Sequence, residues 1–161
     1  VNIKSILDLE ALPNVIIYFS LSPENETKEF DIKTRSLKSK IKTLQILQEK
    51  GFQIALHFDS IIYTPKCIDN YEQLLRHLKS CLNLHLINYL SLGVVRFTAP
   101  VYREFSQNYP ESNIHSYNFT RSFDNKMRYP KPLRLWLLNT IKQKAIDAGI
   151  SENKIYLCME E

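Results

Sequence analysis

The side chains best suited to chemistry stand at the ends of two apolar runs. Ser20 and Ser22 follow the first run, and His57 and Asp59 end the second. These positions are informative because α/β proteins place ligand sites at the carboxyl ends of their strands. Serine hydroxyls there suit a polar small molecule, although Ser20, Ser22 and Asn25 are equally typical of a turn. His57 is either a site residue or an ordinary hydrogen-bonded histidine.

A second group mixes cations with aromatic rings late in the chain. The cations are Arg121, Lys126, Arg128, Lys131 and Arg134, and the rings are Phe123, Tyr129 and Trp136. Such a mixture suits phosphates and unstacked bases. A solvated loop that turns its aromatic rings into the core explains the same residues equally well.

Several classes of site are disfavoured by what the sequence lacks. The only glycines are Gly51, Gly93 and Gly149, so no glycine-rich phosphate loop exists, and neither His-Glu-x-x-His nor Gly-x-Ser-x-Gly occurs. The cysteines Cys67, Cys81 and Cys158 match no zinc, disulfide or cluster spacing. We therefore expect no metal ligands in this chain and a reducing, cytoplasmic location.

Length and composition indicate one globular domain over residues 1–161. Hydrophobic residues make up 44% and charged residues 24% of the chain, which is ordinary for such a domain. The net charge of +4 is compatible with a polyanionic partner. No apolar stretch is long enough to span a membrane and no secretory leader opens the chain, so we expect no membrane partner.

Periodicity predicts alternating helices and strands. The predicted helices are 3–12, 36–51, 69–82 and 133–148, and the predicted strands are 15–19, 52–58, 87–97 and 155–157. Ser36 and Gly51 bound the second helix, and Asp69 or Asn70 caps the third. Residues 21–34 are predicted as a turn and a polar stretch, and residues 100–132 show no clear pattern. This order favours parallel strands. Three or four such units are about half of an eight-unit barrel, so the chain is a small open sheet or a piece of something larger.

Six segments, taken in order, resemble the spore photoproduct lyase family. They are Ser20-Leu21-Ser22-Pro23, Thr34-Arg35-Ser36-Leu37-Lys38-Ser39-Lys40-Ile41, Gly51-Phe52 leading to His57-Phe58-Asp59, Gly93-Val94-Val95-Arg96-Phe97, Lys126-Met127-Arg128-Tyr129, and Tyr156-Leu157-Cys158-Met159-Glu160. The ordered set, together with its last segment, is specific although no single motif is diagnostic. The resemblance covers nearly the whole chain.

The family consists of radical S-adenosylmethionine (AdoMet) enzymes, and its named member splits a thymine dimer in spore DNA. The resemblance implies the carboxyl-terminal half of such an enzyme: a partial TIM-like βα barrel with parallel strands and a carboxyl-terminal helical or irregular extension. It implies cofactor-binding roles for five residues and substrate-binding roles for four. The former are Ser20, Ser22, Lys40, His57 and Asp59, and the latter are Arg96, Lys126, Arg128 and Tyr129. The implied partners are DNA and the amino-terminal half of the same protein.

The chain also departs from the family pattern. The Cys-x-x-x-Cys-x-x-Cys motif is absent, as is the upstream cysteine of the repair reaction, so a [4Fe-4S] cluster would be bound by residues outside this chain and no catalytic residue is assigned. Ser22 replaces a usual asparagine, Lys40 a common arginine, and Asp59-Ser60 a frequent Asp-Pro. The alternative function is a non-catalytic basic α/β module that binds nucleic acid, or an inactive remnant.

Overall fold

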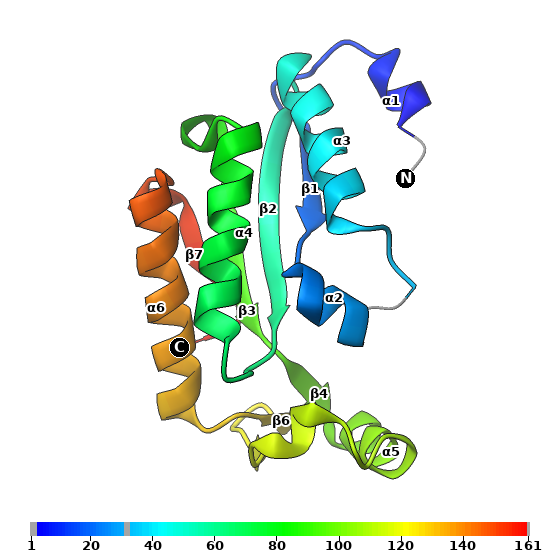
Figure 1. Ribbon diagram of the computed structural model, residues 1–161, viewed down its shortest axis with the longest axis vertical. Helices are drawn as coiled ribbons and strands as arrows, with labels where there is room; N and C mark the ends of the chain where they lie inside the picture. Colours follow the sequence, from blue (N-terminus) through cyan, green and yellow to red (C-terminus); the bar gives the residue numbers. More distant parts are fainter. Residues whose placement is uncertain (1–2, 31–32, 161) are drawn as a thin grey trace.

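The structure is a computed structural model that describes residues 3–30 and 33–160. Its main sheet contains four parallel strands in the order β1 (Ile16–Ser20), β2 (Gln53–Ile61), β3 (Leu90–Val94) and β7 (Ile155–Leu157) (Figure 1). Each strand pairs with the next strand of this set along the chain, as in the wall of a βα barrel. The predicted α/β fold with parallel strands is confirmed.

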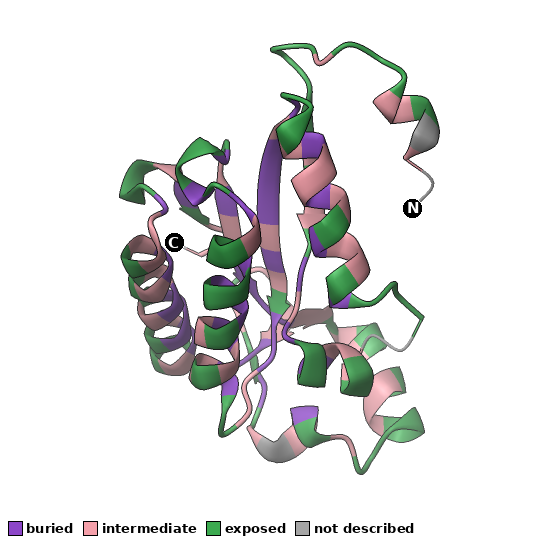
Figure 2. Ribbon diagram, turned by 45° about the horizontal axis from the view of Figure 1, so that its top comes forward, coloured by how far each residue is buried: buried purple, intermediate pink, exposed green. Residues whose placement is uncertain are grey.

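Three long helices cover one face of this sheet. They are α3 (Leu37–Glu49), α4 (Cys67–Cys81) and α6 (Lys131–Ala148), and α4 contacts both of the others (Figure 1). Alternate β2 side chains, Ile54, Leu56 and Phe58, are almost fully buried. Figure 2 shows the buried positions concentrated where helices and sheet meet. The core is therefore one layer between the sheet and its helices.

The opposite face of the sheet is open in the described part of the chain. Ile17 and Phe19 pack against the core, so Tyr18 between them points to the other face, where 57% of its surface is exposed. Tyr156 on β7 is equally exposed. The strands therefore form an uncovered wall, with β1 and β7 as its edges.

A small antiparallel sheet lies beyond the carboxyl ends of the parallel strands. It contains the strands β4 (Arg96–Thr98), β6 (Lys126–Arg128) and β5 (Thr120–Arg121), in that order across the sheet. The helix α5 (Ala99–Asn108) follows directly after β4 in the chain (Figure 1). The third predicted strand breaks at Val95, whose N–H donates to the Ile61 carbonyl oxygen at 3.0 Å. The chain then leaves the main sheet as β4.

Three of the four predicted helices are found as α3, α4 and α6, and the prediction near the start of the chain fails. Ser36 caps α3 as predicted, accepting from the Ser39 N–H at 3.3 Å, and Gly51 follows the helix with a φ of +83°. α4 begins at Cys67, before the predicted caps. Residues 24–30, predicted as polar turn, form α2 (Glu24–Phe30), and the first predicted helix is reduced to α1 (Lys4–Leu7). Short 3₁₀ turns complete the fold: η1 (Leu84–Leu86), η2 (Asn113–Ser116) and η3 (Glu152–Lys154).

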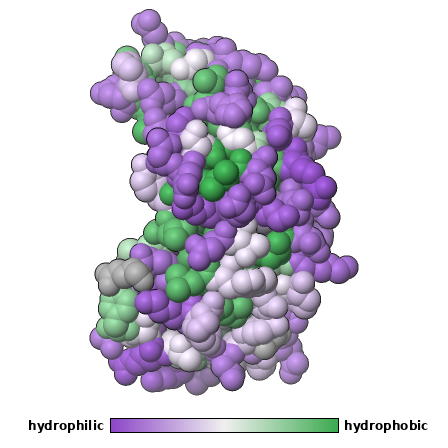
Figure 3. Space-filling model, turned by 90° about the vertical axis from the view of Figure 1, so that its left-hand side faces the viewer, coloured by the Kyte–Doolittle hydropathy of each residue, from purple (hydrophilic) through white to green (hydrophobic). Residues whose placement is uncertain are grey.

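The side of the molecule seen in Figure 3 is mostly hydrophilic, with small separate hydrophobic patches. Among the described helices, none combines the length and apolar character that crossing a bilayer requires.

Candidate functional site

The carboxyl ends of β1 and β2 open onto a cavity of about 370 Å³. Ser20, Ser22 and Asp59 supply polar groups to its wall, and Phe30, Phe97 and Phe105 supply much of its apolar lining. Ser20 is the last residue of β1 and pairs with His57 on β2. Asp59 follows His57 two positions later on the same strand. The parallel register thus brings together residues that lie almost 40 positions apart in the sequence.

Lys40 is fixed at the same edge of the sheet. It lies in the first turn of α3, and its Nζ donates to the Ser20 carbonyl oxygen at 3.0 Å. This bond joins an ammonium group from a helix to the end of β1. Ser20 therefore lies next to two of the other predicted cofactor-binding residues, Lys40 and His57.

Asp59 is held at the cavity by a close approach to β3. It pairs with Gly93, and a Cβ at position 93 would lie only 2.7 Å from the Asp59 Cγ. The Asp59 carboxylate lies 3.9 Å from Arg96 Nη1, while Arg96 Nη2 lies 3.9 Å from Cys158 Sγ. Groups of both charge signs therefore meet beyond the ends of three strands.

His57 lies on the open face of the sheet and is not among the residues that line the cavity. Its ring stacks on Tyr18 with a centroid separation of 4.3 Å, and Nε2 lies 3.0 Å from the Tyr89 hydroxyl. Burial lowers the pKa of His57, and the nearby Asp59 charge opposes that shift. The imidazole is thus favoured in its neutral form, with a ring nitrogen able to accept a proton.

The predicted substrate-binding residues differ in their accessibility. Lys126 keeps 30% of its side chain exposed and lies 3.8 Å from Asp124. Arg128 is buried, donates to the Met159 carbonyl oxygen at 2.8 Å and forms ion pairs with Asp124 and Glu160. Tyr129 is fully buried. Of the four predicted residues, Arg96 and Lys126 are the two that reach solvent.

Sequence reasoning missed Glu26, which lines the same cavity and is only 3% exposed. Glutamate is rarely buried, and α2, the helix that carries Glu26, was not predicted. The polar composition of residues 24–30 gave no apolar stripe that could have indicated a packed helix.

The thiols of the chain do not fit an iron–sulfur cluster. Cys67 and Cys81 stand at opposite ends of α4, roughly 20 Å apart at 1.5 Å per residue, and Cys158 follows β7. No group of three or more possible ligands that could hold a metal ion occurs among residues 3–30 and 33–160. The cavity does fit AdoMet, because the Asp59 carboxylate and the hydroxyls suit its cationic and ribose groups, and the Lys40 and Arg96 cations beside the cavity suit its carboxylate.

Comparison with solved structures supports the fold. A spore photoproduct lyase double mutant with bound AdoMet and dinucleoside spore photoproduct superposes with a TM-score of 0.80 over 97% of this chain, at 16% identity. A spore photoproduct lyase complexed with dinucleoside spore photoproduct gives a TM-score of 0.78 at the same identity and coverage. The chain spans 47% of the length of each of these proteins.

A comparison with curated proteins gives no match. The family model described as spore photoproduct lyase, by contrast, matches residues 1–149. Because this match covers most of the sequence, the chain belongs to the spore photoproduct lyase family.

Proposed function

We propose that this chain forms part of the wall of a radical AdoMet barrel that repairs DNA by direct reversal of thymine dimers. The observation that carries the proposal is the cavity at the carboxyl ends of the parallel strands, where Ser20, Ser22 and Asp59 converge. Family membership and the ligands bound in the similar solved structures support the same function. The open face of the sheet then faces the amino-terminal half of the barrel.

The cavity residues would hold AdoMet by charge and hydrogen bonding. The Asp59 carboxylate suits the amino group of AdoMet, the Lys40 ammonium suits its carboxylate, and the hydroxyls of Ser20 and Ser22 suit either the amino-acid end or the ribose. His57 supports the site from the open face. With a reduced cluster held outside this chain, the chemistry supplied at this cavity would be the radical generation that the family uses.

The substrate would approach from the side of the small antiparallel sheet. Arg96 and Lys126 reach solvent there and would contact phosphates. Arg128 and Tyr129 act from the interior, where Arg128 holds β6, the strand that begins with Lys126, against the segment after β7.

AdoMet titration of the ¹⁵N-labelled chain, followed by NMR, tests the cofactor site. We expect amide shifts concentrated at residues 20–22 and 57–59, and weaker binding in Lys40→Met. Lys42→Met is the matched control, because it removes an exposed ammonium from the same helix. Shifts elsewhere, or equal affinities in both variants, would reject these assignments. DNA binding without any AdoMet response would instead favour the non-catalytic nucleic-acid module.

A further inference from the structure

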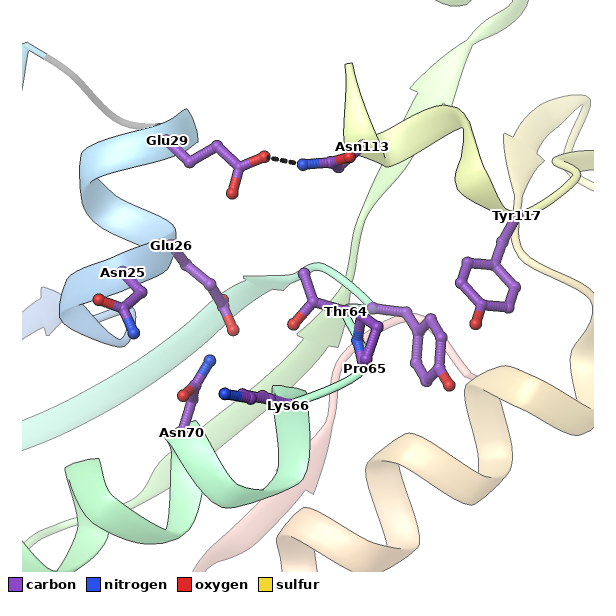
Figure 4. A pocket seen from close by; sticks show the side chains of 10 residues that line it. Asn25, Glu26, Glu29, Thr64, Pro65, Lys66, Asn70, Asn113 and Tyr117 are labelled. Atoms are coloured by element: carbon purple, nitrogen blue, oxygen red, sulfur yellow. Dashed lines mark hydrogen bonds between the residues drawn. The ribbon is translucent and has the colours of Figure 1, made fainter. Parts of the chain in front are cut away.

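A second pocket lies between three segments that follow the carboxyl ends of strands. It has a volume of about 460 Å³ and lies between α2, the loop from β2 into α4, and the η2 region (Figure 4). Asn25 and Glu29 come from α2, Thr64 from the loop, Asn70 from α4, and Tyr117 from the residue after η2. None of these five residues lines the proposed AdoMet cavity.

Glu26 links the two spaces, because it lines both. Figure 4 shows its side chain running from α2 toward Thr64, Lys66 and Asn70. Glu26 is 97% buried, and neither of its carboxyl oxygens has a hydrogen-bond partner of normal geometry. A buried carboxyl whose contact with the Tyr71 hydroxyl falls short of a normal hydrogen bond is costly, and a ligand with complementary hydrogen-bonding groups would lower that cost.

The surroundings of the Glu26 carboxyl favour its neutral form near pH 7. Burial is the main cause that raises its pKa to about 8, the Tyr71 hydroxyl opposes the shift, and the Glu29 charge adds to it. The titratable and charged groups around it are Glu29 of α2, Asp59 of β2, Lys66, Cys67 and Tyr71 at the start of α4, and Tyr129 after β6. Burial keeps the three buried groups Cys67, Tyr71 and Tyr129 protonated by raising their pKa values, so Glu26 is the group whose charge changes near pH 8.

The rest of the lining favours a neutral, planar molecule. The Glu29 carboxylate accepts from Asn113 Nδ2 at 2.7 Å, and its charge is balanced by that of Lys66 across the pocket. The remaining polar groups are the amides of three asparagines and the hydroxyls of Tyr63, Thr64 and Tyr117, all of which can both donate and accept. Tyr63 and Tyr117 meet edge to face with centroids 4.2 Å apart, and so offer aromatic surface beside these groups.

We propose that this pocket binds a neutral heterocycle that carries a donor and an acceptor side by side, as a nucleobase does. A protonated carboxyl pairs with such an edge through two hydrogen bonds, and an asparagine amide does the same. An anion is disfavoured because the single cation that lines the pocket, Lys66, is already offset by the Glu29 carboxylate. An organic cation would need Glu26 to be ionised, so its binding would strengthen as pH rises. This site shares Glu26 with the AdoMet cavity and none of its other lining residues, and it does not depend on the proposed function.

The test is the affinity of the chain for adenosine and thymidine, measured by ligand-detected NMR at about pH 6.5 and about pH 9. We expect at least one nucleoside to bind at the lower pH and to bind about tenfold more weakly at the higher pH, because Glu26 is then mostly ionised. Glu26→Gln keeps a donor and an acceptor, so it should bind equally at both pH values. Glu24→Gln, an exposed glutamate on the same helix, should behave as the wild type.

Two further variants locate the binding. Asn70 lines this pocket and not the AdoMet cavity, so Asn70→Leu should abolish nucleoside binding. Asp59 lines the AdoMet cavity and not this pocket, so Asp59→Asn should leave nucleoside binding intact. Circular dichroism at both pH values checks the fold of each protein. The proposal would be overturned if neither nucleoside binds at either of the two pH values, or if binding is stronger at the higher pH. It would also be overturned if Asp59→Asn abolishes nucleoside binding while Asn70→Leu does not.

Discussion

The Asp59 carboxylate lies over β3 where the chain has no side chain at position 93. In Gly93→Ala the new Cβ would lie 2.7 Å from the Asp59 Cγ, so the Asp59 carboxylate must shift from its present position. We expect a loss of about 1–3 kcal/mol in the free energy of unfolding, measured by urea denaturation. Ser91→Ala, two residues earlier on the same strand, is the control and should have little effect. If Gly93→Ala lowers the free energy of unfolding by the same amount in an Asp59→Ala background, the clash with the Asp59 carboxylate is not the cause of the destabilisation.

Glu26 makes the stability of the fold depend on pH. Its pKa is about 8 in the folded chain against an ordinary 4.5, so the folded state binds the proton more tightly than the unfolded state. The unfolding free energy should therefore fall as pH rises from about 4.5 to about 8, and level off above that. Glu26→Gln removes this dependence. Relative to wild type, the variant should gain about 1.4 kcal/mol or more between pH 5 and pH 8 in urea unfolding. A constant difference between the two proteins would contradict this account.

At the scale of elements, buried ion pairs join the end of the chain to α6 and β6. Arg134 donates to both carboxylate oxygens of Glu160, at 2.8 and 3.0 Å, and to the Tyr129 carbonyl oxygen at 2.7 Å. Arg128 also pairs with Glu160. These contacts hold the segment after β7 against the antiparallel sheet, and therefore fix the position of Lys126 on β6.

Glu160→Gln should destabilise the chain by about 3 kcal/mol, because two buried guanidinium groups lose their shared carboxylate. Thermal unfolding followed by circular dichroism measures the change. The control is Glu152→Gln, which removes a carboxylate that pairs with Lys142 at the surface, and its effect should be small. If the two substitutions lower the stability equally, the ion pairs of Glu160 contribute no more to stability than a pair at the surface.

The same scale explains what could be predicted from the sequence. α3 and β2 were predictable because Leu37, Ile41 and Leu44 recur at helical spacing and Ile54, Leu56 and Phe58 alternate. α2 and α5 were not. α2 buries a glutamate in place of an apolar stripe, and the ten residues of α5 include none that is fully buried. The spacing of apolar residues in a sequence indicates which side chains are buried. A helix that buries few apolar side chains therefore shows no helical pattern in its sequence.

The candidate site was predictable where it depends on the ends of strands, and not where it depends on packing between distant segments. Ser20 and Asp59 were identified because both follow apolar runs, and the parallel register then brings them together. The burial of Arg128 depends on partners more than 30 residues later in the chain. Local sequence contains no information about such a contact.

At the scale of the whole molecule, the net charge of +4 and the exposed cations near the antiparallel sheet predict salt-dependent binding to DNA. Plotted as log affinity against log salt concentration, binding of an oligonucleotide should fall with a slope of about −0.9 for each phosphate contact. Lys126→Ala should reduce that slope by about one unit. Lys79→Ala changes the net charge by the same amount, but Lys79 lies near the end of α4, and it is the start of this helix that lies at the carboxyl edge of the sheet. The salt slope of this variant should therefore stay near that of the wild type. A slope near zero in the wild type, or equal reductions in both variants, would remove the antiparallel sheet as the DNA-facing surface.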